Sequence, residues 1–171
     1  IVVYFANFVG AIIIAYLISE SGLFNMTEGL LGAAAIKTAV AKSSLTFKEA
    51  FIRGIFCNVL VVLAVWMAAA AKDIVGKVFA CWFPVMTFVM SGFEHSIANM
   101  YFIPAGIFAA ANPLCVEAAG LTAAQMTTLN MSGFIANLIP VTLGNIVGGS
   151  IVIGLTYWFV HCHRVPTKVP T

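Results

Sequence analysis

Long apolar stretches, separated by short polar segments, form the main pattern of this chain. Charged side chains are absent from the runs 1–19, 54–71, 78–93, 95–116 and 118–163. A membrane-spanning helix needs about 20 mainly apolar residues. We therefore predict an all-α integral membrane protein, a single transmembrane domain over 1–171 that ends in a cytoplasmic tail. The predicted crossings lie at about 1–19, 48–71, 78–112 and 132–161, and the tail at 162–171.

The third predicted crossing is too long for one straight helix, and Ser91 and Gly92 lie near its middle. We expect two half-helices joined near 91–92 by non-helical backbone. Membranes tolerate such backbone only where protein encloses it or where it lines a cavity. Glu94 and His95 follow the break directly. Polar side chains at this depth are costly enough to indicate a function.

Composition narrows the class of protein further. The chain is 62% hydrophobic and 8% charged, with a mean hydropathy of +1.06, which excludes an ordinary soluble domain. The sequence contains no motif typical of serine hydrolases, zinc proteases or nucleotide-binding loops, and its four cysteines lie far apart. We expect no enzyme, cofactor, metal, disulfide or nucleic-acid partner. A metal at His161, Cys162 and His163 is less favoured than a membrane-surface anchor.

The chain begins in apolar sequence at Ile1, without an initiator methionine, a basic flank or a cleavage pattern. We therefore expect that this segment is not a signal peptide. We also expect that an amino-terminal part of the protein is missing from the chain.

Basic residues give a mixed indication of orientation. The connection after the second crossing and the tail both carry lysine or arginine, which predicts that they face the cytoplasm. The opposite side carries basic residues as well, at Lys37, Lys42, Lys48 and Arg53. Two interpretations remain open: neighbouring glutamates dilute the bias, or a basic mouth concentrates anions.

A short internal echo relates the first and last crossings. Residues 7–11 and 145–149 both read asparagine, apolar, valine, glycine, small residue. Transporters built from inverted repeats leave such echoes, whereas glycine- and alanine-rich helices produce them by chance. The sequence leaves both explanations open.

Three segments resemble signatures of the formate/nitrite transporter family: SGFEHSIANM at 91–100, Ile103–Pro104, and NLIPVTLGNIVGG at 137–149. The resemblance implies an aquaporin-like helical bundle of six helices, two of them broken, of which this chain holds the third to the sixth. It also implies a homopentamer with one pore per protomer in the cytoplasmic membrane of a prokaryote. Members pass small monovalent anions or their acids, such as formate, nitrite, lactate and hydrosulfide.

The resemblance also implies roles for individual residues. His95 corresponds to the central pore histidine, Phe88 to an aromatic residue of one apolar constriction, and Lys42 to the lysine near the outer vestibule. Supporting buried polar positions correspond to Asn58, Glu94, Asn99 and Asn145. The opposite constriction belongs to a helix that this chain does not contain.

Elementary electrostatics supports such a site independently of the resemblance. An anion pays a large solvation cost in hydrocarbon, whereas its neutral acid pays much less. Lys42 would attract the anion, and His95 would donate a hydrogen bond or a proton, because imidazole changes charge near neutral pH. Burial favours neutral imidazole, so the proton could come from His95 or from water.

Local geometry suggests structural roles for the other polar residues. Glu94 should point away from His95 and hold the break through asparagine side chains or free amides. Asn99 shares the helical face of His95 and could orient the imidazole. Asn58 and Asn145 are expected to join helices.

Two other functions remain as alternatives. Asn112–Pro113 hints at an aquaporin-like pore for small neutral solutes. A haem-binding subunit with His95 as axial ligand would require a second histidine at a similar depth.

Overall fold

The computed structural model describes residues 1–162, and over this range every regular element is a helix. The helices follow one another as α1 (Val2–Glu20), α2 (Leu30–Ser43), α3 (Phe47–Ala70), α4 (Ile74–Met90), α5 (Ser96–Ala109), α6 (Pro113–Ala119), α7 (Met131–Ile146) and α8 (Thr156–His161). A 3₁₀ turn, η1 (Leu23–Asn25), follows α1, and a π-helix, η2 (Val147–Leu155), joins α7 to α8. The predicted tail after Cys162 lies outside the described residues.

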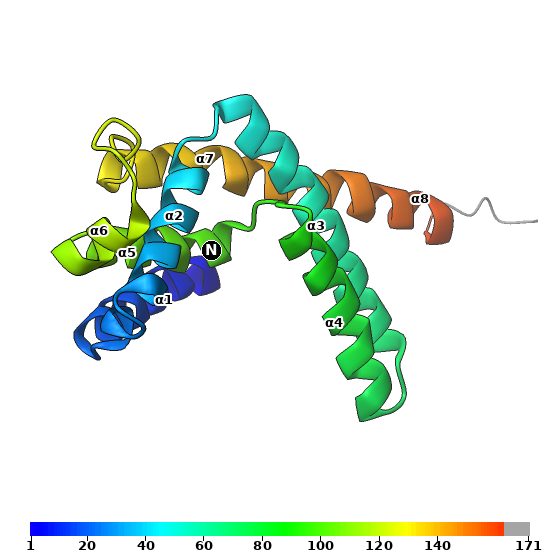
Figure 1. Cartoon of the computed structure of the whole chain (residues 1–171). Coiled ribbons are helices and arrows are strands. Elements are labelled where there is room, and N and C mark those ends of the chain that lie inside the picture. Colours follow the sequence, from blue (N-terminus) through cyan, green and yellow to red (C-terminus); the bar gives the residue numbers. More distant parts are fainter. Residues whose placement is uncertain (163–171) are drawn as a thin grey trace, which may run out of the picture.

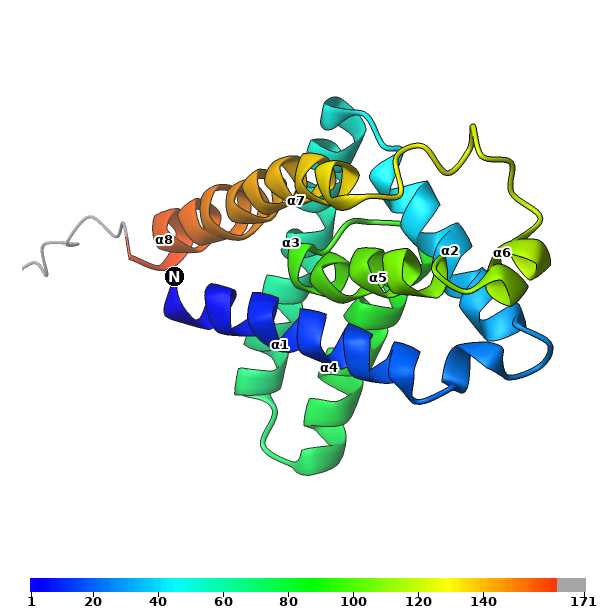
Figure 2. The same cartoon turned by 90° about the vertical axis from the view of Figure 1, so that its left-hand side faces the viewer.

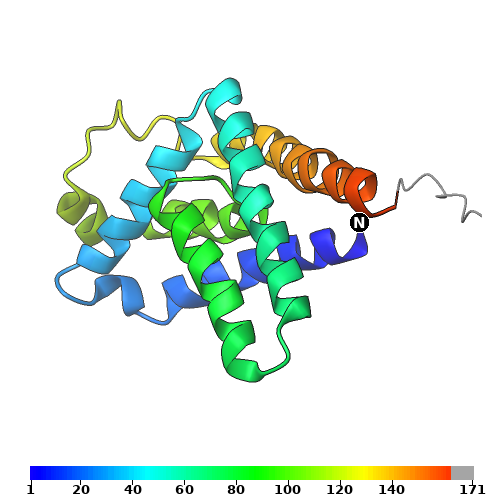
Figure 3. The ribbon, with the colours of Figure 1, turned by 90° about the vertical axis from the view of Figure 1, so that its right-hand side faces the viewer.

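Helix α5 lies at the centre of the packing, between α1 and α7 (Figures 2 and 3), and α2 packs along it. Helix α3 packs against α7 and pairs with α4 in a hairpin that extends away from the other helices (Figure 1). Three helical stretches are long and apolar enough to cross a membrane: 2–20, 47–70 and the continuous helix 131–161. The positions of the membrane boundaries stay predictions.

Helix α2 occupies a segment that the sequence analysis treated as a loop between crossings. Lys37 and Lys42 interrupt its apolar positions, which removed it from the charge-free runs. Its small residues lie close to α5: a Cβ built on Gly106 would lie 2.2 Å from the Cβ of Ala39. Close packing of small residues, which a search for apolar length does not detect, therefore holds this helix.

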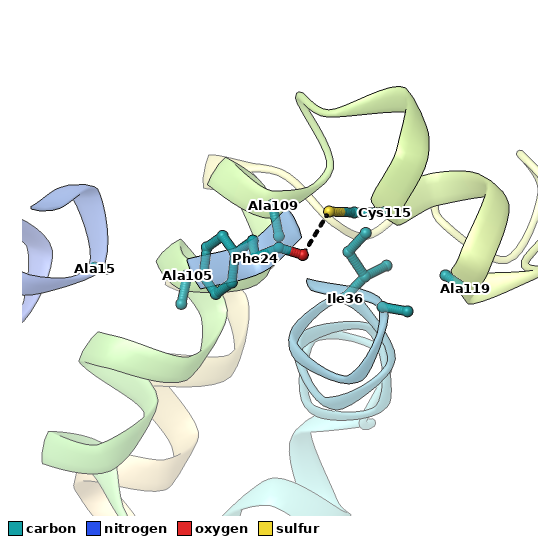
Figure 4. Close-up of a cluster of buried hydrophobic side chains, with 8 residues drawn as sticks. Ala15, Phe24, Ile36, Ala105, Ala109, Cys115 and Ala119 are labelled. Carbon is teal, nitrogen blue, oxygen red and sulfur yellow. Dashed lines mark hydrogen bonds between the residues drawn. The ribbon is translucent and has the colours of Figure 1, made fainter. Parts of the chain in front are cut away.

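A buried cluster fixes the start of α2 against its neighbours. Phe24 and Ile36 pack with Cys115 and with small residues of α5 and α6 (Figure 4). The Cys115 thiol donates to the backbone oxygen of Phe24 over 3.4 Å. This cluster anchors one end of α2, and Lys42 lies at the other end.

The chain is non-helical from Ser91 to His95, between α4 and α5. Gly92 has a φ of 67°, in the left-handed region that glycine adopts without strain. The backbone amide of Glu94 donates to the backbone oxygen of Arg53 on α3 over 3.3 Å. The end of the break at Glu94 is thus buried and bound to α3, whereas Ser91 and Gly92 are exposed. Pro104 lies inside α5 rather than at the break.

Helices α3 and α7 come very close together. A Cβ built on Gly54 of α3 would lie 2.8 Å from the backbone oxygen of Val141 on α7. Glycine at this position lets the two backbones pack directly. The contact brings α7 beside the break and completes the surroundings of His95.

Candidate functional site

A closed ring of hydrogen bonds ties α2, the break, α5 and α7 together. Lys42 Nζ lies 2.9 Å from Glu94 Oε1, and Asn99 Nδ2 donates to Glu94 Oε2 over 2.6 Å. Asn99 Nδ2 also donates to Asn137 Oδ1 over 2.8 Å, and Asn137 Nδ2 donates to the backbone oxygen of Lys42 over 2.8 Å. Glu94 is 3% exposed, so this carboxylate depends on its partners.

Asn145 joins three segments through one side chain. Its Oδ1 accepts from the Ser96 amide at the start of α5 over 2.9 Å. Its Nδ2 donates to the backbone oxygens of Gly54 and Glu94, each over 2.9 Å. Asn58 Nδ2 in turn donates to the backbone oxygen of Asn145 over 2.7 Å. Both asparagines therefore join helices, as their sequence positions suggested.

His95 is the N-cap of α5. Its Nδ1 accepts from the Ala98 amide over 3.3 Å. A nitrogen that accepts a hydrogen bond carries no proton, so the proton of the neutral ring lies on Nε2. The imidazole stacks on the Phe88 ring, with 5.8 Å between centroids and 26° between planes. The predicted constriction residue and the predicted pore histidine are therefore direct neighbours.

Two hollows meet at His95. The first, called here the Lys42 hollow, has a volume of about 420 Å³ and is lined by Lys42, Arg53, Phe88, Glu94 and Phe102, among others. The second, called the Tyr4 hollow, has a volume of about 560 Å³, and its polar lining includes Tyr4, Asn58, Thr142, Asn145 and Ser150. Among residues 1–162, His95 alone lines both.

The two hollows differ in charge. Two cations and one carboxylate line the Lys42 hollow, whereas the side chains described around the Tyr4 hollow are all uncharged. In the Tyr4 hollow, Thr142 donates to the backbone oxygen of Leu138 over 2.6 Å. The Tyr4 hydroxyl, 2.7 Å from the same threonine oxygen, is then the donor of their mutual bond. The Tyr4 oxygen therefore keeps an acceptor position that this bond does not use.

Comparison with known proteins agrees with this arrangement. A family model described as "Formate/nitrite transporter" matches residues 1–159. The chain belongs to the formate/nitrite transporter family. This membership confirms the predicted family, and the structural match reported next confirms the all-α channel fold.

Named relatives and solved structures place the chain within the family. It is 44% identical to the "Formate channel FocA" of Escherichia coli (strain K12) over 162 residues, which are 93% of this chain and 57% of that protein. It is 42% identical to a "Probable formate transporter" of Methanothermobacter thermautotrophicus, covering 91% of this chain and 56% of that protein. The solved "Pentameric formate channel with formate bound" superposes with a TM-score of 0.85 at 43% identity, covering 94% of this chain and 64% of that one.

The chain thus spans less than two thirds of the length of these relatives. The relatives are named as channels and transporters, which agrees with the expectation that the chain is not an enzyme.

The structure brings most of the predicted site residues together, with two differences in geometry. Glu94 was expected to point away from His95, but both residues line the Lys42 hollow. Asn99 was expected to orient His95, but its amide nitrogen is shared between Glu94 and Asn137. Asn99 lies in the first turn of α5, on the side of the helix that faces α7. Asn137 was not singled out from the sequence. An asparagine in the apolar run of α7, eight residues before Asn145, was the available signal.

The features behind the alternative functions lie away from His95. Asn112 caps α6 through the Leu114 amide and lines neither hollow. His161 is exposed on α8 beside Tyr157, with 5.5 Å between ring centroids. Within residues 1–162, no cluster of three or more histidine, cysteine or acidic side chains is placed to hold a metal. His163 lies outside the described residues.

Proposed function

We propose that this chain is part of a membrane channel that passes small monovalent anions or their neutral acids, with formate, nitrite and hydrosulfide as substrates. The observation that carries the proposal is the position of His95, where a charged hollow meets an uncharged one. An anion is favoured in the first hollow, and a neutral acid costs much less to transfer into the second. Protonation between the two hollows would make the passage possible.

His95 serves in this proposal as a hydrogen-bond donor to the passing solute. Its Nε2 carries the proton, because Nδ1 accepts from the Ala98 amide. An imidazolium would place a second proton on Nδ1, against that amide, and would remove the cap of α5. The proton that neutralises the anion therefore comes from water in the Lys42 hollow.

Phe88 and the polar network complete the proposed site. Phe88 narrows the passage by stacking on His95. Lys42 lines the charged hollow and, through Glu94, holds the break in place. Asn58, Asn99 and Asn145 support the same backbone. These polar residues thus keep the imidazole in position.

The assembly and location follow the relatives. We propose a homopentamer, because the superposed formate channel is described as pentameric. Relatives in Escherichia coli and Methanothermobacter thermautotrophicus favour the cytoplasmic membrane of a prokaryote. A native mass of five copies for the solubilised protein is the expected result.

Uptake into proteoliposomes tests the function and the role of His95. Formate, nitrite and hydrosulfide fluxes are measured against pH for the native protein, His95→Ala and His95→Asn. His95→Ala should lose about tenfold or more in flux, the scale of one charge-assisted hydrogen bond. Asparagine can cap α5 and still donate a hydrogen bond, so His95→Asn should retain most of the flux and the native pH profile.

Each outcome of this experiment is informative. His161→Ala, at the exposed end of α8, is the matched control and should behave as the native protein. A native protein without flux of any of these anions rejects the proposed function. If His95→Asn is as inactive as His95→Ala, the imidazole itself supplies the proton. A pH-independent flux of neutral solutes would instead support the aquaporin-like alternative.

A further inference from the structure

The charges that line the Lys42 hollow do not contribute equally. Lys42 Nζ lies 2.9 Å from Glu94 Oε1, and the side chains of this pair are 17% and 4% exposed. The ammonium is thus tied to a counter-charge, and the net charge of the pair is zero. The hollow retains one net positive charge, which belongs to Arg53.

Arg53 is held in place while its guanidinium stays available. Its backbone oxygen accepts from the Glu94 amide, which fixes its position beside the break. Within residues 1–162, the guanidinium makes no hydrogen bond or ion pair. The nearest carboxylate along the helix, Glu49, interacts electrostatically with Arg53, but it is exposed and is bound to the Thr46 amide and hydroxyl over 3.0 and 2.7 Å. Glu49 does not line the hollow.

The chemistry of arginine suits a particular class of anion. A guanidinium stays protonated at any physiological pH and presents a planar fork of N–H donors. This fork matches two oxygens of one planar anion, and such paired hydrogen bonds are among the stronger ones in proteins. Formate and nitrite have this shape, whereas hydrosulfide has a single sulfur atom and cannot accept both bonds in this way.

We propose that Arg53, and not Lys42, collects the anion in the Lys42 hollow, and that it favours planar anions with two oxygens over hydrosulfide. This inference rests on the proposed channel function and assigns its specificity to one residue. It also decides between the two interpretations of the basic residues on this side: the mouth concentrates anions, through Arg53. Phe88 and His95 line the same hollow, so an anion held by Arg53 lies at the entrance to the proposed constriction.

The test compares Arg53→Gln, Arg53→Lys and the control Lys48→Gln in proteoliposomes. Lys48 is an exposed cation of the same helix that does not line the hollow. Arg53→Gln should raise the half-saturating concentration of formate by about tenfold, the scale of one lost charge-assisted hydrogen bond. Hydrosulfide uptake should fall less, because this anion loses the attraction of the charge but no paired hydrogen bonds. Arg53→Lys should recover part of the formate affinity, because charge returns without the fork.

Ionic strength provides a second measurement. Salt should weaken formate uptake by the native protein, because screening shortens the reach of an accessible charge. The same titration should be nearly flat for Arg53→Gln and native-like for Lys48→Gln. A half-saturating concentration that is unchanged in Arg53→Gln, with native formate flux present, overturns this inference alone. Equal losses for formate and hydrosulfide overturn its specificity. Absence of native formate flux rejects the channel function itself.

Discussion

At the scale of single residues, the site consists of polar groups bonded to one another in apolar surroundings, and Asn99 Oδ1 is a buried atom of residues 1–162 that has no partner. Glu94 binds Lys42 through one oxygen and Asn99 through the other. A buried carboxylate with both oxygens bonded is stable, but it becomes costly when either partner is lost. The Lys42–Glu94 pair therefore holds the break in place rather than supplying charge to the hollow. This agrees with assigning anion capture to Arg53.

Replacement of Glu94 by glutamine tests this view of the pair. Glu94→Gln keeps the shape of the side chain but leaves the Lys42 ammonium without its counter-charge. Breaking a buried pair costs roughly 3–5 kcal/mol, and the partial exposure of Lys42 places the expected loss near the lower end. Thermal unfolding of the solubilised protein measures it. Glu117→Gln, on the exposed side of α6, should leave the melting temperature unchanged. Equal melting curves for both variants would contradict a structural role.

Sequence reasoning found some of these residues and missed others for a physical reason. Glu94 and His95 were visible because they interrupt an apolar run beside a break. The partner of Asn99 was not visible, because a helical wheel describes one helix and Asn137 approaches from another. Hydrogen bonds between side chains of different helices depend on how the helices pack, and a single sequence does not reveal that packing.

At the scale of elements, the break between α4 and α5 is held by α3 and α7. Asn145 on α7 contacts the start of α5, the backbone of Glu94 and the backbone of α3. Asn7, at the corresponding place in the sequence echo, is exposed on α1. Similar local sequence therefore has different surroundings in the two helices.

This contrast provides a matched pair of substitutions. Asn145→Ala leaves the Ser96 amide and two carbonyls without their partner, at about 1–3 kcal/mol for each buried group left unsatisfied. We expect a lower melting temperature and a loss of formate flux, because His95 stands beside Ser96. Asn7→Ala should change neither. If both variants keep native stability and flux, the break is held by other contacts.

Elements differed in how well the sequence predicted them. Helices α1, α3 and α7 coincide with long apolar runs, and the residues between α4 and α5 include Gly92, where the sequence indicated a break. Helix α2 was not predicted, because lysines interrupt its apolar positions and because small residues hold it against α5. The π-helix η2 was also not predicted, because the hydropathy pattern does not depend on which backbone hydrogen bonds a helix makes.

At the scale of the whole molecule, the arrangement separates charge along a line through His95. The Lys42 hollow has a net positive charge and the Tyr4 hollow has uncharged polar side chains. Such a separation favours an anion on one side and a neutral acceptor of hydrogen bonds on the other. Under the proposed channel function, this separation favours a solute that can change its charge.

Nitrite and nitrate distinguish this requirement from simple size selection. Both are small, planar monovalent anions with oxygens that fit a guanidinium fork, so Arg53 should bind each of them. Nitrite is the base of a weak acid and can be protonated near His95, whereas nitrate is the base of a strong acid and stays charged. Because a bare charge pays a large cost in an apolar constriction, nitrite should pass and nitrate should compete for entry without crossing. Stopped-flow uptake of each anion into proteoliposomes, with formate as the competitor, measures both effects. Equal rates for nitrite and nitrate would show that the pore passes the ions themselves.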